Sequence, residues 1–294
     1  MGADTMRSSR CRVTQGLLVL GVLCLMGFAP RQKAEQDQGP LQDILARSAR
    51  YCERLKALAL HFVCHEEITI DTFDYAQKTV WRVGRAGRAA QEIDLKLRRK
   101  GQTEYLYDYQ LIRKGDLNRE KRILLRENGR SAYQEDAELP YQRFWSEFLV
   151  YGPVGFLSEF WQPHFEYEIM DRGSFQDRAA LLIRASPSSA RKINHNHGAI
   201  WVDEEDCRIM KIVWDPRSIS DFSPRVSTSA GGELQRELEW FVEYGVEKNG
   251  IMFPSRQVIQ EILIGSAGRR HPKYTVTVLY TGYRFFTVET EVKY

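Results

Sequence analysis

The chain has 294 residues, of which 42 are Lys or Arg and 39 are Asp or Glu, a formal net charge of +3. Residues 1–34 hold five of these basic and one of these acidic side chains, which leaves 37 basic and 38 acidic groups in residues 35–294. This near-neutral remainder lacks the basic footprint of a nucleic-acid-binding protein. It is long enough for one large β domain or two smaller ones.

Residues 1–34 have the pattern of a secretory signal peptide. Three arginines precede an apolar run at 16–29, which is short for a membrane span and typical of a signal sequence. Cleavage after Ala34 is one candidate, and an uncleaved N-terminal anchor is the alternative. We therefore predict a signal peptide over 1–34 and a single domain over 35–294. The protein is expected to be secreted, with the periplasm as its compartment.

Export would leave Cys52, Cys64 and Cys207 in an oxidising compartment. Apolar spacing predicts a helix over about 41–60, which includes Cys52, and a strand that begins near Cys64. If that strand folds back along the helix, about 12 Å of helix and about 10–13 Å of strand bring the two sulfurs to one height. This geometry predicts a Cys52–Cys64 disulfide, and it leaves Cys207 as an unpaired thiol.

Two alternatives to the disulfide remain open. Cys52 and Cys64 could be free structural thiols, or they could bind a metal together with His61 and His65. Successive strand residues point to opposite faces, which separates Cys64 from His65 and disfavours the metal site.

Strand signals dominate the rest of the chain. Tyr105, Tyr107 and Tyr109 alternate along one face of a strand, as expected for a half-buried sheet. Asn128-Gly129 and Asn249-Gly250 are strong hairpin turns. Strands at short spacing with tight turns indicate antiparallel pairing, and we count roughly nine to eleven of them.

Three other segments interrupt this pattern. Residues 30–40 are polar and predict a flexible leader, and the Ser/Pro/Gly-rich stretch 215–233 predicts a long loop. Residues 141–161 have helical apolar spacing on both sides of a Gly-Pro, which predicts two short amphipathic helices. Their bulky side chains form a candidate lid or cavity wall for a ligand: Phe144, Trp145, Phe148, Phe156, Phe160 and Trp161.

No motif in the sequence specifies a reaction. His195 and His197 have a spacing that can bind a metal, but Asn-His-Asn-His-Gly is also a polar turn before a strand, which we favour. The glycines of 82–88 lack the helix start that a phosphate-binding loop needs. The sequence therefore predicts no catalytic residue, no metal ligand and no cofactor.

The pattern of residues 198–214, GAIWVDEEDCRIMKIVW, predicts a strand, an acidic turn and a second strand. This element, after a signal sequence and an early helix, resembles the LolA-like superfamily of outer-membrane lipoprotein-sorting proteins and related periplasmic sensors. The resemblance implies an α+β fold in which a large curved antiparallel sheet forms an incomplete β-barrel. An N-terminal helix and mid-chain helices would cover its concave face, around an apolar cavity for acyl chains.

These observations predict a non-enzymatic protein that binds a hydrophobic ligand in an apolar groove beneath residues 141–161. Lipid or lipoprotein acyl chains are the expected ligand, with peripheral membrane contact, no nucleic acid and an open oligomeric state. The principal alternative is an envelope protein-interaction or sensor module without lipid cargo. A hydrolase with scattered catalytic residues is a third hypothesis.

Overall fold

The computed structural model describes residues 29–58, 61–83, 89–114, 117–140, 149–189, 195–219, 222–227, 233–265 and 268–286. The chain divides into two units, residues 1–39 and 40–294. The predicted signal peptide lies mostly outside the described ranges. Within the first unit, the described residues from Ala29 onward are helical, so the predicted flexible leader over 30–40 is wrong.

The elements follow one another with many strands and few helices. In chain order they are α1 (Ala29–Leu58), β1 (Phe62–Val83), β2 (Ala89–Lys114), β3 (Leu117–Glu127), β4 (Arg130–Gln134), η1 (Leu149–Tyr151), α2 (Val154–Leu157), η2 (Gln162–His164), β5 (Phe165–Phe175), β6 (Arg178–Pro187), β7 (Gly198–Asp203), β8 (Ile209–Trp214), η3 (Pro216–Ser218), β9 (Arg225–Ser227), β10 (Glu233–Lys248), β11 (Ile251–Ile264) and β12 (Arg270–Phe285). None of the helices in these ranges combines the length and apolarity that a bilayer span requires.

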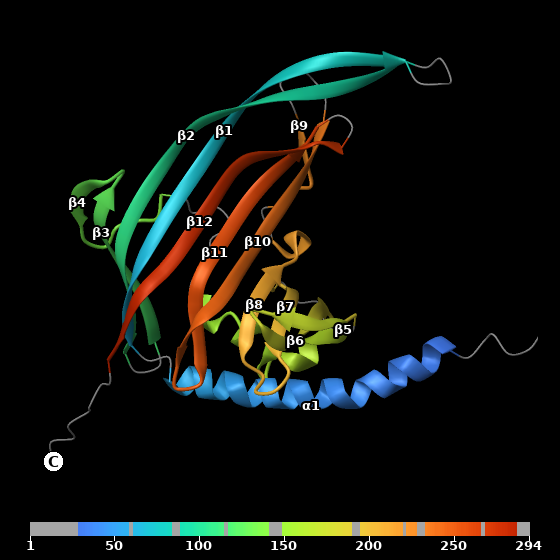
Figure 1. The fold of residues 1–294 in the computed structure, drawn as a ribbon, viewed down its shortest axis with the longest axis vertical. Helices are drawn as coiled ribbons and strands as arrows, with labels where there is room; N and C mark the ends of the chain where they lie inside the picture. The colour runs from blue at the N-terminus through green and yellow to red at the C-terminus, as the bar shows by residue number, and fades with distance from the viewer. Residues whose placement is uncertain are drawn as a thin grey trace, which may run out of the picture. The chain divides into compact units, whose positions relative to one another are not determined.

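One antiparallel sheet contains all twelve described strands, as Figure 1 shows. Its order is β4-β3-β2-β1-β12-β11-β10-β8-β7-β6-β5, and β9 pairs with β10. The sheet is open, because β4 and β5 are its edges. The predicted α+β class with a large antiparallel sheet is confirmed. The strand count is one above the predicted range.

The hairpin turns form where the sequence predicts them. Asn128-Gly129 joins β3 to β4 and Asn249-Gly250 joins β10 to β11, and all four residues have positive φ. Asn and Gly tolerate this left-handed backbone, which matches the twist of the flanking strands. The acidic turn after Asp203 joins β7 to β8, also as predicted.

Residues 40–58 of α1 pack across the ends of strands rather than along β1 (Figure 1). The Met252 amide at the start of β11 donates to the Tyr51 hydroxyl over 3.0 Å. The Gln162 amide donates to the Leu45 carbonyl over 2.7 Å. The buried face of α1, with Leu55 fully buried, therefore contacts both a sheet turn and the mid-chain segment.

The predicted Cys52–Cys64 disulfide is wrong, since the thiols of Cys52, Cys64 and Cys207 are all free and buried. The strand does not fold back along the helix. Instead, β1 pairs with β2 and β12 along a line that leads away from α1. The Cys52 Sγ lies 3.6 Å from the Pro153 carbonyl oxygen, to which it donates. Burial raises the pKa of the Cys52 thiol to about 12.

The second helix predicted within 141–161 is shorter than expected, because α2 ends at Leu157. Ser158 leaves the helix with ψ of 153°, and its hydroxyl donates to the Val154 carbonyl over 2.7 Å. Trp161 therefore lies beyond the helix, just before the short 3-10 turn η2. Most of the first predicted helix falls in residues 141–148, outside the described ranges.

Gly198 gives a sharp test of the β7–β8 register. A Cβ at this position would lie 2.1 Å from the Val213 carbonyl oxygen and 2.9 Å from the Asp215 nitrogen, both main-chain atoms. We expect Gly198→Ala to lower the free energy of unfolding by about 1–3 kcal/mol, the usual cost of forced overpacking. Urea denaturation followed by circular dichroism measures the change.

The matched control is Gly173→Ala in β5, where a Cβ meets nothing within 4 Å. Alanine there should be neutral or stabilise by about 0.5–1 kcal/mol, because glycine loses more backbone entropy on folding. Equal effects of the two substitutions would contradict the close approach at Gly198.

Thiol labelling tests the cysteine assignment. We expect residues 35–294, purified without reductant, to expose three reactive thiols in denaturant and almost none when folded. Burial and a raised pKa both suppress the thiolate that reacts. A single reactive thiol in denaturant would indicate that two of the three cysteines form a disulfide, as the sequence predicted.

Candidate functional site

Alternate residues of the central strands form a buried inner face. On β1 this face contains Phe62, Cys64, Glu66, Ile68 and Ile70, because side chains two apart share a side of a strand. The register places Ile68 opposite Val278 of β12 and Tyr105 of β2. The same face continues across β11, β10 and β8 through Ile259, Val242 and Ile212, each fully buried. We call this surface the inner face.

A charged cluster is buried at the β1–β3 side of the inner face. The Arg122 guanidinium donates to both carboxylate oxygens of Glu66, with N–O distances of 2.7 and 3.2 Å. It also donates to Glu120 over 3.1 Å, and it lies over the Tyr109 ring at 4.6 Å. The Tyr109 hydroxyl donates to Glu120 over 2.7 Å. Every charge here has a close partner.

Burial nevertheless perturbs the ionisation of this cluster. Glu66 is fully buried, and desolvation raises the pKa of its carboxyl although Arg122 opposes the shift. Desolvation likewise raises the pKa of the Tyr109 hydroxyl. The cluster is therefore a neutralised structural element rather than an open charged site.

A second polar group on the inner face has no partners. Gln257 is fully buried on β11, and neither its amide nitrogen nor its amide oxygen makes a hydrogen bond to any residue that the structure describes. Trp240 Nε1 on β10 is also unpartnered, as is one carboxylate oxygen of Glu261. Ile259 lies opposite Trp240, so Gln257 and Glu261 flank that position and all three polar groups are neighbours.

The surroundings of these groups are well packed. The Trp214 and Trp240 rings stack with centroids 4.5 Å apart, and the second Glu261 oxygen accepts from Lys273 over 3.0 Å. A buried polar group without a partner costs about 1–3 kcal/mol, and native proteins contain few of them. A cluster of them inside an apolar wall marks a place where water or a polar ligand group belongs.

The predicted lid residues fall into three environments. Phe156 is buried and its ring stacks on Phe165 at 6.1 Å, so it belongs to the core. Trp161 is half-buried and stacks on His195 at 4.3 Å. Phe160 is 71% exposed. Phe144, Trp145 and Phe148 lie outside the described residues, and the ligand-binding role of all six stays a prediction.

The space beneath the described part of this segment is small. A void bordered by Leu149, Val150, Tyr280 and Arg122 has a volume of about 10 Å³, the size of one water molecule. No groove for acyl chains is open there among the described residues. The predicted apolar groove therefore stays a prediction, and a ligand would need Leu149 and Val150 to move.

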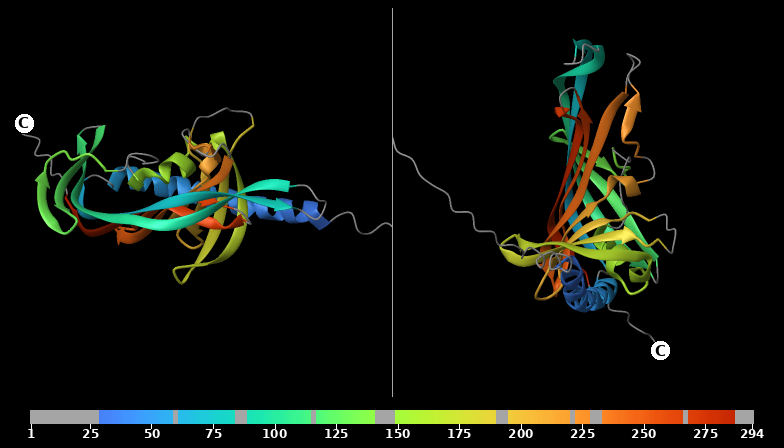
Figure 2. Two further views of the ribbon diagram at one scale, coloured as in Figure 1. Left: turned by 90° about the horizontal axis from the view of Figure 1, so that it is seen from above. Right: turned by 90° about the vertical axis from the view of Figure 1, so that its right-hand side faces the viewer.

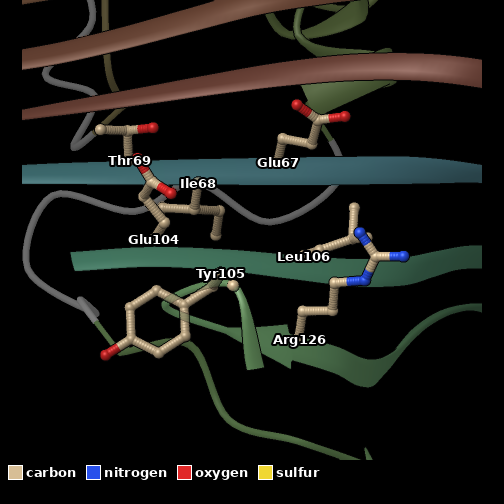
Figure 3. A pocket seen from close by; sticks show the side chains of 8 residues that line it. Glu67, Ile68, Thr69, Glu104, Tyr105, Leu106 and Arg126 are labelled. Atoms are coloured by element: carbon tan, nitrogen blue, oxygen red, sulfur yellow. The ribbon is translucent and has the colours of Figure 1, made fainter. Parts of the chain in front are cut away.

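A larger depression of about 340 Å³ opens elsewhere, between β1, β2 and the β3–β4 turn (Figure 3). Side-chain alternation places Glu67 and Thr69 on the side of β1 opposite the inner face. The lining is mainly polar: Glu67, Ile68, Thr69, Glu104, Tyr105, Leu106, Arg126 and Gly129. Such walls do not suit an apolar ligand.

The histidine pair lies in irregular backbone just before β7. The polar turn favoured from the sequence begins at residues outside the described ranges and stays a prediction. The His197 carbonyl accepts from the Asp215 amide over 2.7 Å and from the Ser218 hydroxyl over 3.2 Å. The His195 ring lies between Trp161 and the core residue Phe156, and burial lowers its pKa. The two histidines therefore make different kinds of contact: His195 through its ring and His197 through its main-chain carbonyl.

Comparisons with known proteins give distant likenesses only. No family model matches the sequence, and no curated protein matches it. A DUF1329 family protein from Desulfovibrio piger is 8% identical, with 86% of this chain and 95% of that chain covered at a TM-score of 0.34. A putative outer membrane lipoprotein-sorting protein domain from Vibrio parahaemolyticus is also 8% identical, covering 83% and 93% at 0.34.

A LolA superfamily protein from Nitrosomonas europaea is 13% identical, covering 85% of this chain and 96% of that chain at a TM-score of 0.30. A LolA superfamily protein is thus among the solved structures to which this chain is distantly similar.

The sequence carries no clear signal for the unpartnered residues. Trp240 alternates with Leu238 and Val242 in a pattern typical of an apolar strand face, and Gln257 lies in a run, PSRQVIQEILI, where polar and apolar residues alternate irregularly. Glu66 gave a usable signal, because it interrupts the alternation of Cys64, Ile68 and Ile70. Its partner Arg122 could not be found, since it lies 56 residues further along the chain.

Arg122 should be a major contributor to stability. We expect Arg122→Met to lower the free energy of unfolding by about 3–5 kcal/mol, because it leaves the buried Glu66 carboxylate unpaired. Adding Glu66→Gln should recover part of this loss. Urea denaturation of the two single variants and the double variant measures the coupling.

Arg126→Met is the control, because Arg126 is exposed on the same strand. It should change stability by no more than about 0.5 kcal/mol. Additive losses from Arg122 and Glu66 substitutions would show that the pair is not coupled as its geometry indicates.

Proposed function

We propose that this protein is a non-enzymatic envelope protein that binds an amphipathic ligand on its inner face. The ligand has apolar chains and one group that both donates and accepts hydrogen bonds, as in an acyl amide or a hydroxylated lipid. Lipid or lipoprotein acyl chains remain the expected class. The observation that carries the proposal is the set of unpartnered polar atoms on the trio Gln257, Trp240 and Glu261 within an apolar wall, where the other Glu261 oxygen pairs with Lys273 and Arg236.

The chemistry of the trio defines what the ligand must offer. Gln257 supplies an amide donor and acceptor, Trp240 supplies a donor, and the free Glu261 oxygen is an acceptor. A ligand with both donors and acceptors recovers the free energy that these groups lost on burial. The aliphatic residues around them favour methylene chains at about 0.8 kcal/mol for each buried CH₂.

Ligand entry requires part of the cover to move, because the inner face is closed in this conformation. Ile219 and Phe222 belong to the segment between β8 and β9, and Phe222 lies under the Arg236 guanidinium at 4.9 Å. In the described parts of this segment and of residues 149–157, the only helices are the short η3, η1 and α2. Few backbone hydrogen bonds hold such short helices, so they are the natural elements to open.

Lipid extraction tests the proposal directly. The secreted protein, purified without detergent, should yield acyl lipid on denaturing mass spectrometry. A fluorescent fatty acid should bind the delipidated protein and be displaced by that extract. Recovery of no lipid together with no fluorescent binding would overturn the proposal, and a co-purified protein partner on a lipid-free inner face would favour the sensor alternative.

Gln257→Met separates stability from binding. Methionine keeps the volume of the side chain and removes two unpartnered polar atoms, so the free protein should gain about 1–3 kcal/mol. Ligand affinity should fall about tenfold, the equivalent of one lost hydrogen bond. Thermal unfolding of the delipidated protein and fluorescent titration measure the two effects.

Gln260→Met provides the matched control on the same strand. Gln260 points to the opposite face and donates to the Thr275 hydroxyl over 2.9 Å. Its loss should cost about 0.5–1.5 kcal/mol and leave ligand affinity unchanged. A gain in stability from Gln260→Met, or no effect of Gln257→Met on affinity, would count against the trio.

A further inference from the structure

The first two strands continue past the sheet as a two-stranded arm. The last β1 residue paired with β12 is Thr72, opposite Tyr274, whereas pairing with β2 continues to Val83 opposite Ala89. Residues 73–83 and 89–99 therefore pair only with each other. We call them the arm, which Figures 1 and 2 show extending beyond the neighbouring strands.

The base of the arm is fixed on the sheet. Leu95 is 4% exposed and forms a small apolar cluster with Leu234 of β10 and Leu263 of β11, with Tyr75 packed against it. Arg269, just before β12, forms an ion pair with Asp94. Two contacts of different kinds therefore hold this part of the arm against the sheet.

The far end of the arm presents apolar side chains to solvent. Trp81 is 66% exposed and Val83 is 71% exposed. Side-chain alternation puts both on the face that carries Tyr75 and, across the register, Leu95. The apolar side chains on this face are therefore buried at Leu95 and exposed to solvent at Trp81 and Val83. An exposed tryptophan beside an exposed valine marks a surface that contacts something apolar.

The hairpin that contains the arm is basic in a chain that is otherwise acidic. Residues 73–99 contain seven Lys or Arg and three Asp or Glu. The rest of residues 35–294 carries 30 basic and 35 acidic side chains. Lys78, Lys96 and Arg98 are exposed on the face of the arm opposite Trp81 and Val83, where the register places Lys78 across from Asp94 and Arg98 across from Asp74. This separation of charge gives the arm, and not the body of the domain, an attraction for anionic surfaces.

We propose that the arm docks on an anionic lipid surface, with Trp81 and Val83 inserted among the headgroups. Tryptophan prefers the interface between headgroups and acyl chains. Each Lys or Arg near an anionic bilayer adds about 1 kcal/mol of attraction. A nucleic acid would also attract the basic residues, but an exposed valine gains little from contact with stacked bases or phosphates.

Vesicle flotation tests the proposal, and it needs no inner-face ligand. The full mature domain should float with vesicles that contain phosphatidylglycerol and not with pure phosphatidylcholine vesicles. Raising the salt concentration should weaken binding. The double variant Lys78→Glu/Arg98→Glu and the variant Trp81→Ala should each bind at least about tenfold more weakly.

Matched controls keep the result specific to the arm. Arg130→Glu/Arg225→Glu makes the same change in net charge at exposed sites outside the arm, and Tyr133→Ala removes an aromatic side chain that is 71% exposed on β4. Both should bind vesicles like the unmodified protein, and so should Gln257→Met. Failure of that last variant to bind lipid ligand leaves the arm proposal intact.

Equal flotation with neutral and anionic vesicles would overturn the proposal, and so would equal losses in the arm and control variants. Binding of a duplex or single-stranded oligonucleotide without vesicle binding would overturn it as well, and would assign the basic arm to nucleic acid instead.

Discussion

The alternation of side chains along the β1–β12–β11–β10 ladder is the constraint on which the rest of the structure depends. It sends Ile68, Val278 and Ile259 to one buried face, and it carries Glu66, Gln257 and Trp240 there with them. Because the period is two, a slip of one residue would exchange the inner and outer faces of a strand. The polar residues of the inner face are therefore fixed by the same register that builds the core.

The polar residues of the inner face form two groups that differ in their hydrogen bonding. Around Arg122 every charge is paired, and the bidentate contact to Glu66 ties β3 to β1 across β2. Around Gln257 the polar atoms are buried without partners, although Trp240 nearby is tightly stacked. The first arrangement stabilises the empty protein. The second arrangement makes the protein less stable than apolar side chains at these positions would.

Much of the fold could be predicted from the sequence, because its signals are local. The turns at Asn128-Gly129 and Asn249-Gly250 form as predicted, since the positive φ that they require suits those residue types wherever the strands go. The prediction of a Cys52–Cys64 disulfide was wrong because it depended on the direction in which β1 leaves α1. The second helix predicted within 141–161 is too long because Ser158 leaves the helical conformation three residues before Trp161, where the apolar pattern ends.

The sequence by itself determined an antiparallel sheet, its hairpins and the aromatic segment that interrupts it, since each depends on residues a few positions apart. Only the tertiary structure decided that β1 lies beside β12, about 200 residues away. It also decided that Glu66 pairs with Arg122 and that Gln257 is buried without a hydrogen-bond partner among the described residues. It further decided that the arm extends beyond β12, which leaves Trp81 exposed to solvent. Strand neighbours are chosen by the burial of whole faces, which no local pattern encodes.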